Sequence, residues 1–269
     1  MKERLTVLGI ATALAFTYGT GAAPGQQPES TPIIVHEYEA DFEEVAAGVS
    51  KAVLWSNHDK GSYGGFTRFE PEFDSGVHTY TNDIWIVVIQ GAYVYKDDAG
   101  ERRVERGDSI RIPGGTRHRS GGDTQWGALF YEESSALGFT YTSGDALTQQ
   151  HKQDNAPVVV SMDEASFKEV APGVSRAVLW GDHDKGPYGA FTEFEPEFDS
   201  GTNTQTNDIW IVVIQGFYLY KDDAGEKRLG PGDFIRIPGG TKHRSGGDKK
   251  WGTVFYEASD GKFDWVPAQ

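Results

Sequence analysis

The sequence predicts an all-β fold of two tandem jelly-roll barrels, and three observations support that prediction. Shifting the chain by 125 residues aligns it with itself without a gap, so that FEPEFDSG at 69–76 recurs at 194–201. Within each repeat, short apolar or alternating runs are separated by turns rich in glycine, of which the chain has 34. No long run shows the 3.6-residue period of a helix, apart from a turn or two near residues 162–168. A repeat this long is expected to have its own core.

The first segment in chain order, residues 1–23, has the pattern of a secretory signal peptide. Lys2 and Arg4 precede an apolar run over residues 5–18, and small residues follow at 22 and 23. The run is too short for a comfortable membrane span. We therefore expect an exported protein, periplasmic or secreted, with no stable membrane insertion once the signal is cleaved. A retained interfacial anchor is the alternative.

The rest of the chain divides into a lead-in, two barrels and a linker. Residues 24–32 are polar and contain proline, which predicts a flexible lead-in. The repeat predicts a first barrel over 33–145, a linker over 146–157 and a second barrel over 158–269. Strands are expected where hydrophobic residues alternate or run together between turns. In the first barrel these are DIWIVVIQG (83–91), AYVYK (92–96), DSIRIP (108–113) and GALFYEE (127–133).

Composition narrows the classes of partner. The formal net charge of -15 argues against nucleic acid, because affinity for a phosphate backbone comes mainly from Lys and Arg. A small-molecule ligand, neutral or cationic, is easier to accommodate. Because the chain has no cysteine, it forms no disulfide and no thiolate metal site, and packing must supply its stability.

A spacing of glycine, proline and histidine occurs once in each repeat. GDSIRIPGGTRH begins at Gly107 and GDFIRIPGGTKH begins at Gly232. In each, a strand is expected to end at the proline, two glycines allow a tight turn, and the chain returns with His118 or His243 pointing inward. The spacing resembles the second cupin motif, although the asparagine that usually ends that motif is glycine in both repeats.

The stretch VHTYTNDIWIVVIQG resembles the first cupin motif, which has two histidines and an acid before a final glycine. His78 is present, but Tyr80 stands at the second histidine position and Ile84 at the acid position. In the second repeat the two histidine positions hold Asn203 and Gln205. The chain therefore resembles a bicupin over both repeats, which implies an RmlC-like jelly roll in each.

More narrowly, AVLWGDHDKGPYGAFTEFEP (177–196) resembles bacterial proteins built from the DUF4437 cupin-like domain. The resemblance implies a fold and not a reaction, because cupins include dioxygenases, isomerases, lyases, sugar epimerases, storage proteins and ligand-gated regulators. It also implies that the two barrels can diverge, since often only one barrel of a bicupin is active. Self-association stays open, because two fused barrels can form within one chain the interface that single cupins make by dimerising.

The first repeat holds the candidate metal site. Side chains two apart on a strand share a face, so His78, Tyr80 and Asn82 are expected to point together. His78 and His118 would supply two nitrogen ligands, and Tyr80 an oxygen ligand, to one divalent Fe, Mn, Ni or Zn ion. The alternative is that Tyr80 only lines the pocket while the two histidines hydrogen-bond each other or a water.

The second repeat is expected to bind a ligand without a metal. Asn203 and Gln205 are neutral amides and weak ligands for a transition metal. Amides can still hold a hydroxyl or carboxylate group through hydrogen bonds. The candidate ligand-binding residues are Asn203, Gln205, Asn207 and His243 in the second repeat and Asn82 in the first.

Two further pairs of polar residues have two interpretations each. His58 and His183 each lie beside an aspartate, which fits a turn histidine better than a general acid or base on the rim. Glu132 and Glu257 would either reach the cavity from the last strand or end an exposed strand.

Arginines and tryptophans are expected to have structural roles. The arginines around the histidine motif should face outward and pair with carboxylates; they are Arg111, Arg119, Arg236 and Arg244. The tryptophans should fill the cores or the interface between the barrels; the pairs are Trp55 and Trp180, Trp85 and Trp210, and Trp126 and Trp251.

The sequence as a whole predicts an exported bicupin that binds a small polar metabolite, with metal-assisted catalysis of an unknown reaction in the first barrel. The alternative is a non-catalytic ligand-binding or sensor module with degenerate metal sites. A structural or storage role is compatible with the resemblance, but no residue selects it.

Overall fold

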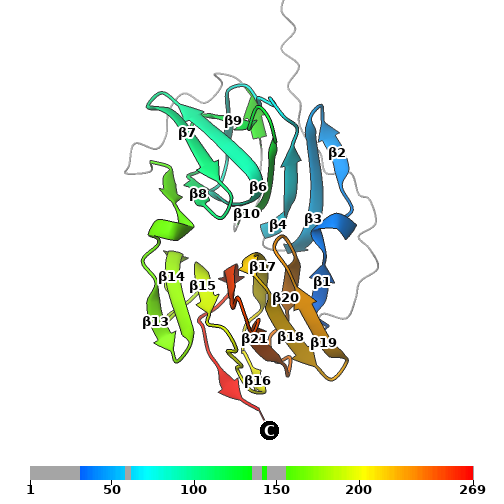
Figure 1. Ribbon diagram of the computed structural model, residues 1–269. Helices are drawn as coiled ribbons and strands as arrows, with labels where there is room; N and C mark the ends of the chain where they lie inside the picture. The colour runs from blue at the N-terminus through cyan, green and yellow to red at the C-terminus, as the bar shows by residue number, and fades with distance from the viewer. Residues whose placement is uncertain (1–30, 58–61, 135–140, 144–155, 269) are drawn as a thin grey trace, which may run out of the picture.

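The computed structural model describes residues 31–57, 62–134, 141–143 and 156–268 (Figure 1). The expected signal peptide and most of the expected lead-in and linker lie outside these ranges. The predicted all-β class is confirmed, because the described residues form strands and two short 3-10 helices, Glu37–Glu39 (η1) and Met162–Glu164 (η2). In this part of the chain, no helix has the length and apolar character that a membrane span requires.

The strands of the two repeats follow the same order along the chain. Those of the first repeat are β1 (Ile33–Val35), β2 (Glu43–Ala46), β3 (Val49–Asn57), β4 (Ser62–Phe69), β5 (His78–Tyr80), β6 (Ile84–Asp97), β7 (Gly100–Glu105), β8 (Ser109–Ile112), β9 (Arg119–Gly122), β10 (Ala128–Ser134) and β11 (Tyr141–Ser143). Those of the second are β12 (Val158–Val160), β13 (Lys168–Ala171), β14 (Val174–Gly181), β15 (Tyr188–Phe194), β16 (Asn203–Thr204), β17 (Ile209–Gly216), β18 (Tyr218–Asp222), β19 (Gly225–Leu229), β20 (Phe234–Ile237), β21 (Arg244–Gly247), β22 (Thr253–Ser259) and β23 (Val266–Pro267). The expected strands at 83–91 and 92–96 are one strand, β6, which turns at Gly91 with φ 67°.

The two main sheets exchange their first strands. The order β12-β8-β6-β10-β4-β3-β2 places β12 of the second repeat on the sheet of the first, and β1-β20-β17-β22-β15-β14-β13 places β1 on the sheet of the second. The pairing is antiparallel, with Ile34 opposite Ile235 and Val159 opposite Ile110. The strand ladders of the described residues do not close into a barrel, so the two-barrel description remains a prediction.

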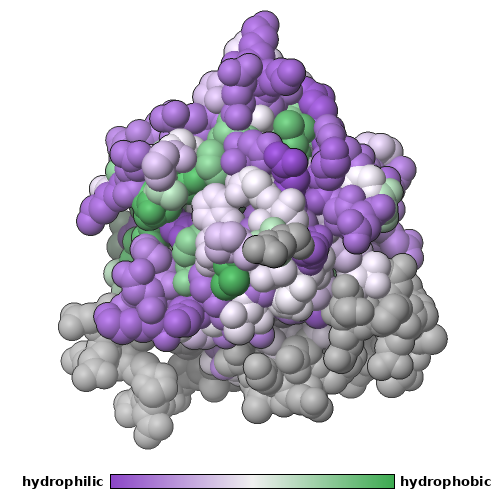
Figure 2. Space-filling view, turned by 90° about the horizontal axis from the view of Figure 1, so that it is seen from below, coloured by the Kyte–Doolittle hydropathy of each residue, from purple (hydrophilic) through white to green (hydrophobic). Residues whose placement is uncertain are grey.

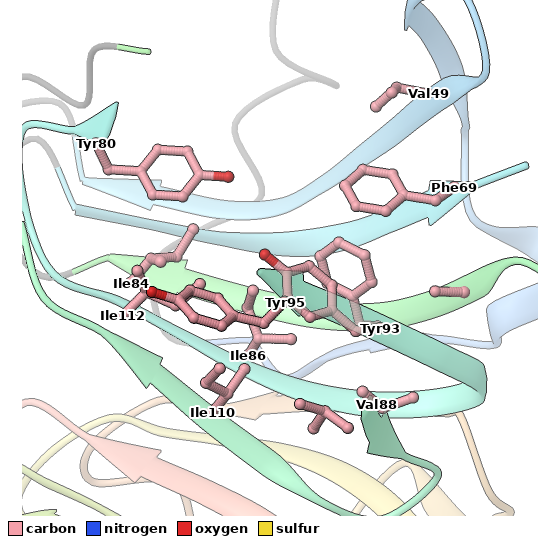
Figure 3. Packing of buried hydrophobic residues seen from close by; sticks show 13 residues of the cluster. Val49, Phe69, Tyr80, Ile84, Ile86, Val88, Tyr93, Tyr95, Ile110 and Ile112 are labelled. Carbon is pink, nitrogen blue, oxygen red and sulfur yellow. The ribbon is translucent and has the colours of Figure 1, made fainter. Parts of the chain in front are cut away.

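Strand alternation divides the apolar side chains among three cores. On β10, Ala128 and Phe130 face the interior of the first repeat, whereas Leu129 and Tyr131 face a central cluster shared by both repeats. Figure 3 shows the first interior, where Tyr93 and Tyr95 from β6 lie above Ile86 and Ile110. A matching interior cluster, which includes Tyr218 and Phe255, fills the second repeat. Each repeat thus has its own interior, and the repeats pack back to back.

Four tryptophans join the repeats. Trp55 stacks on Trp210 with ring centroids 4.6 Å apart, and Trp85 lies 5.0 Å from Trp180, so the expected place between the repeats is confirmed for these pairs. The expectation is wrong for Trp126 and Trp251, which are 71% and 63% exposed. They lie in the tight turns before β10 and β22, where the backbone N–H of each donates to the aspartate that opens the turn.

One carboxyl group lies inside the central cluster. Glu133 accepts hydrogen bonds from Tyr131 Oη at 3.0 Å and from Tyr256 Oη at 2.5 Å. These hydroxyls in turn accept from the indole N–H groups of Trp55 and Trp180. Burial raises the pKa of Glu133 to about 7. The equivalent position in the second repeat is Ala258, so this carboxyl has no counterpart.

The arginines around the histidine motif face outward, as predicted. Arg111 pairs with Asp83 and Arg236 with Asp208, while Arg119 and Arg244 pair with aspartates nearer the surface. Asp83 Oδ1 also accepts the backbone N–H of Gly114 at 2.9 Å, which pins the turn that follows β8. A Cβ atom at Gly114 would lie 2.7 Å from the carbonyl oxygen of Thr81, so this close approach requires glycine. The pinned turn directs the chain back toward His118.

Candidate functional site

The two histidines of the first repeat meet inside it. The backbone N–H groups of His78 and His118 each donate to the carbonyl oxygen of the other residue, at 2.8 and 3.0 Å. Their ring centroids lie 4.2 Å apart, and the residues are 0% and 2% exposed. Both imidazoles therefore lie side by side in the interior of the first repeat, turned away from solvent.

His118 has one fixed ring nitrogen and one unpartnered one. Its Nδ1 donates to the carbonyl oxygen of Thr116 at 2.9 Å, which leaves the lone pair on Nε2. That buried Nε2 has no hydrogen-bond partner among the residues the structure describes. Burial lowers the pKa of His118 to about 4, so the ring is neutral at physiological pH.

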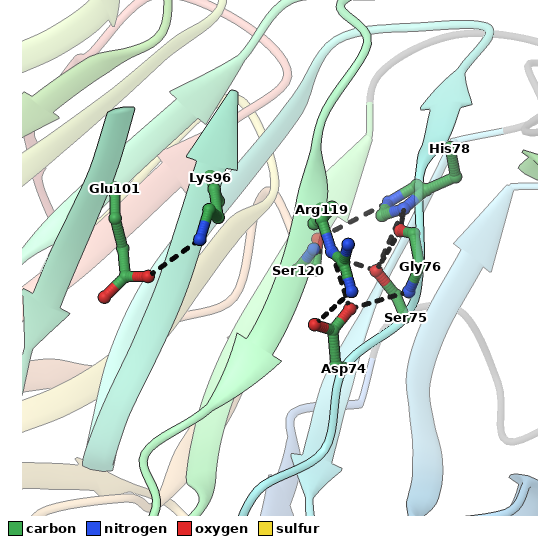
Figure 4. Close-up of polar contacts among 8 residues, drawn as sticks. All are labelled: Asp74, Ser75, Gly76, His78, Lys96, Glu101, Arg119 and Ser120. Carbon is green, nitrogen blue, oxygen red and sulfur yellow. Dashed lines mark hydrogen bonds and ion pairs between the residues drawn. The ribbon is translucent and has the colours of Figure 1, made fainter. Parts of the chain in front are cut away.

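His78 is held in the same tautomer (Figure 4). Its Nδ1 lies 3.0 Å from Ser75 Oγ and 3.1 Å from the carbonyl oxygen of Gly76. Because the Ser75 hydroxyl already donates to the same carbonyl, both atoms accept from Nδ1–H. His78 Nε2 faces Ser120 Oγ at 3.4 Å. Burial, and next the nearby His118, lower the pKa of His78 to about 3.

Two tyrosine rings enclose the histidine pair. Tyr80 lies 4.9 Å from the His78 ring and 5.2 Å from the His118 ring, and Figure 3 shows its hydroxyl directed over the interior cluster. Tyr95 stacks on His118 at 5.2 Å, nearly parallel to it. Tyr95 is not among the site residues predicted from the sequence. The alternation in AYVYK, which puts Tyr93 and Tyr95 on one face, could have indicated it.

The donor set fits two ligands of a transition metal. Two neutral imidazoles with Nδ1 tied to backbone carbonyls present Nε2, which is how histidine ligands are commonly oriented. Tyr80 could add an oxygen only if the ion's charge favoured its ionised form. No third histidine, aspartate or glutamate joins the pair within the described ranges. The set is therefore a two-histidine site without a carboxylate.

In the second repeat, Asn203 takes the place of His78 with the same contacts. Its Nδ2 donates to Ser200 Oγ at 2.9 Å and to the carbonyl oxygen of Gly201 at 3.1 Å. His243 Nδ1 donates to the Thr241 carbonyl at 2.9 Å, and burial lowers the pKa of His243. The amide thus replaces the Nδ1–H of a histidine but supplies no atom corresponding to Nε2.

The predicted asparagines Asn82 and Asn207 lie in the turns after β5 and β16. Asn82 lies between β5 and β6, where its Nδ2 donates to Thr81 Oγ1 at 3.4 Å. Asn207 Nδ2 donates to the carbonyl oxygen of Lys262 at 3.0 Å, so it holds the C-terminal segment in place. The alternation of side chains between two faces does not extend past Tyr80, because the strand ends there.

Each repeat buries an acid and a base that the histidine motifs do not include. Glu132 contacts Lys51 and accepts from Tyr63 Oη at 3.1 Å. Glu257 accepts from Arg176 Nη2 at 2.7 Å, and from Tyr188 and Thr192. Both glutamates are 4% exposed, so of their two interpretations the inward one holds. Lys51 and Arg176 were missed, although each stands two residues after an interior valine in GVSKAVLW and GVSRAVLW.

The second repeat contains a small, partly open pocket of about 30 Å³. Asn203 and Gln205 line it at one end, and Arg176 and Glu257 contribute the charged groups. Asn207 and His243 are not among its lining residues. By the 125-residue repeat, the corresponding positions in the first repeat are His78, Tyr80, Lys51 and Glu132.

His183, the rim histidine within the described residues, has the contact expected of a turn histidine. His183 Nε2 lies 3.4 Å from Asp184 Oδ1, which confirms a turn histidine beside its aspartate. His58 lies outside the described residues.

Two protein families match parts of the chain. DUF4437, a domain of unknown function, matches residues 164–269, and the cupin domain family matches residues 65–125. No curated protein matches the sequence significantly. The chain therefore contains a cupin-like domain.

Solved structures share the fold over most of the chain. A proposed dioxygenase from Nostoc punctiforme has a TM-score of 0.71 at 15% identity, over 89% of this chain and 87% of that one. Salicylate 1,2-dioxygenase from Pseudoaminobacter salicylatoxidans, in complex with gentisate, has a TM-score of 0.64 at 12% identity, over 87% and 83%. Oxalate decarboxylase from Bacillus subtilis has a TM-score of 0.56 at 14% identity, over 87% and 79%. Likeness at such low identity shows the fold alone.

Proposed function

We propose that the protein is an exported bicupin that binds a small polar metabolite and carries out metal-assisted chemistry in its first barrel. The observation that carries the proposal is the buried pair of neutral imidazoles, His78 and His118, with ring centroids 4.2 Å apart. Export is supported by the signal-like pattern of residues 1–23. The neighbours named as dioxygenases and as oxalate decarboxylase make redox or carboxylate chemistry reasonable on this fold.

His78 and His118 would hold a divalent Fe, Mn, Ni or Zn ion, with Tyr80 as an oxygen neighbour. Such an ion would act as a Lewis acid on a carbonyl or carboxyl group of the substrate. Ser75 and Thr116 orient the two rings, and the Tyr80 and Tyr95 rings exclude water from them.

Buried Glu132 and partly exposed Lys51 add one charged group of each sign to the first barrel. Tyr93 Oη lies 2.5 Å from Ser120 Oγ, which in turn faces His78 Nε2. The nearby Glu132 helps to raise the pKa of Tyr93, after the larger effect of burial. The Tyr93 and Ser120 hydroxyls are therefore engaged with each other and with His78, and a substrate in this interior would meet a charged group from Lys51.

Metal analysis of the purified protein tests the proposal. After reconstitution with Fe, Mn, Ni or Zn, we expect one ion per chain in the wild type and none in His78→Ala or His118→Ala. His243→Ala is the matched control in the second repeat and should retain the ion. A wild type that binds none of the four metals, or an ion that survives both substitutions, would contradict the proposal.

A second candidate function is a non-catalytic ligand-binding or sensor module. It is favoured by the missing carboxylate, because Glu132, the nearest acid on the last strand, is already paired with Lys51. The same metal analysis separates the two functions. Absence of metal from the reconstituted wild type would favour the binding module.

A further inference from the structure

Three buried polar atoms of the second repeat lack hydrogen-bond partners among the described residues. They are Arg176 Nη1, Gln205 Oε1 and His243 Nε2. Arg176 is 4% exposed, and both it and Gln205 line the same cavity. Buried polar groups in native proteins almost always have a partner, and an unsatisfied one is costly. The donor Arg176 Nη1 and the acceptor Gln205 Oε1 thus remain to be satisfied at one pocket.

The rest of the Arg176 guanidinium is fully engaged. Nη2 donates to Glu257 at 2.7 Å, and Nε donates to Thr192 Oγ1 at 3.1 Å. The Arg176 guanidinium carbon lies 4.1 Å from the centre of the Phe263 ring. These contacts fix the guanidinium plane, so that Nη1 is a rigid donor and not a side chain free to find another partner.

Charge decides between a neutral and an anionic occupant. Arg176 and Glu257 already neutralise each other inside the second repeat, with side chains 2% and 5% exposed. A carboxylate placed beside this pair would leave a buried negative charge without compensation, which is strongly unfavourable. A neutral group adds no such charge. The pair therefore selects a neutral compound that accepts one hydrogen bond and donates another.

The C-terminal segment lines part of this pocket. Phe263 and Trp265 line it, and β23 pairs with β16, with Pro267 opposite Asn203. The backbone N–H of Phe263 donates to the carbonyl oxygen of His183 at 2.8 Å. Figure 1 places β16 and the chain end together at the lower end of the molecule, and Figure 2 looks onto that end, where mostly hydrophilic residues surround a smaller apolar group. The pocket is small, at about 30 Å³, and partly open, so its occupant has few non-hydrogen atoms.

We propose that the second repeat binds a small neutral compound without a metal, by accepting its N–H or O–H at Gln205 Oε1 and donating Arg176 Nη1 to its oxygen. A primary amide is the simplest group with both functions. The site does not depend on an ion in the first repeat, so failure of the metal proposal would leave it standing.

Acetamide and acetate form a matched pair of probes, because they have nearly the same shape and differ in charge. The readout is the indole N–H resonance of Trp265 in an NMR titration of the full chain, assigned with Trp265→Phe. We expect acetamide to shift this resonance saturably and acetate to bind at least about tenfold more weakly. A Trp265 resonance that ignores acetamide, or equal affinity for the two probes, would overturn the proposal.

Two substitutions locate the contacts. Gln205→Met removes the acceptor while leaving the Arg176 and Glu257 pair intact, and it should weaken acetamide binding about tenfold. Arg176→Met should weaken binding by at least as much; if that variant fails to fold, Gln205→Met alone decides. Asp98→Asn, at an exposed turn of the first repeat, is the control and should leave the affinity unchanged. Unchanged affinity in Gln205→Met would contradict the proposed site.

Discussion

The two repeats differ at the position of His78 and Asn203, although the backbone contacts around that position are the same. His78 and Asn203 make the same pair of contacts, to a serine hydroxyl and a glycine carbonyl, with distances that agree within 0.1 Å. His78 adds an imidazole Nε2 in the first repeat, and Asn203 adds no such atom in the second. The framework needs one N–H donor at this position, so the remainder of the side chain is free to determine the chemistry.

The buried charged pairs differ in the same manner. Lys51 is 23% exposed in its side chain, whereas Arg176 is 2% exposed and is fixed by Thr192 and Phe263. The ammonium group of Lys51 can reorient near solvent, whereas the guanidinium of Arg176 is held in one orientation away from solvent. The first repeat therefore presents a mobile charge beside two imidazoles, and the second presents a fixed donor beside two amides.

The largest expected effect comes from removing the acid of each pair. Glu257→Gln leaves the guanidinium of Arg176 buried and unpaired, which should lower the free energy of unfolding by about 3–5 kcal/mol. Glu132→Gln should cost about 1–2 kcal/mol, because Lys51 can move its charge toward water. Urea denaturation of both variants measures the difference. Equal losses would show that the two pairs are alike.

Glu133 predicts a pH dependence of stability that has no equivalent in the second repeat, where Ala258 takes its position. Its pKa is raised from 4.5 to about 7, so the folded state keeps a proton that the unfolded state loses between these values. The stabilisation is full below pH 4.5 and is lost as pH rises through 7, with a total of roughly 3 kcal/mol.

Glu133→Gln should remove this contribution to the slope, because the amide keeps the shape and does not ionise. The lowered pKa values of His78 and His118 reduce stability as pH falls below 6.5, and they do so equally in wild type and variant. The measurement is the free energy of unfolding from urea titrations at several pH values between 4.5 and 8, for wild type and variant. Asp98→Asn, at an exposed turn, is a control that should keep the slope. Identical pH profiles for wild type and Glu133→Gln would contradict the assignment.

His78→Asn places in the first repeat the residue that the second repeat has at position 203. We expect the free energy of unfolding to change by less than about 1 kcal/mol, because the amide can keep both contacts of Nδ1–H. Metal retention should be lost all the same, since Nε2 is gone. Thermal unfolding and metal analysis of one preparation provide both results. A large loss of stability would show that the ring itself supports the fold.

The smallest effects are expected where the repeats do not differ. Trp126→Ser and Trp251→Ser each remove an exposed indole and should change the free energy of unfolding by less than about 0.5 kcal/mol. Phe130→Ala, in the first interior, is the contrasting variant and should cost about 3–5 kcal/mol. A loss above 1 kcal/mol in either tryptophan variant would indicate that the indole is covered by another molecule in solution.

Much of the candidate site could be predicted from residue spacing. The glycine turn and strand alternation were enough to bring His78 and His118 to one interior and to send Arg111 and Arg236 outward. The sequence-based expectation failed at Trp126, since a turn residue has no fixed face.

The sequence by itself determined the all-β class, the repeat, and which side chains alternate inward, because these depend on residues close together along the chain. Only the tertiary structure decided that β1 and β12 exchange sheets, that Glu133 meets Tyr256 from a position 123 residues away, and that Arg176 Nη1 has no partner among the described residues. Burial and pairing depend on segments distant in sequence that pack together, and a local pattern of hydrophobic residues does not specify which segments these are.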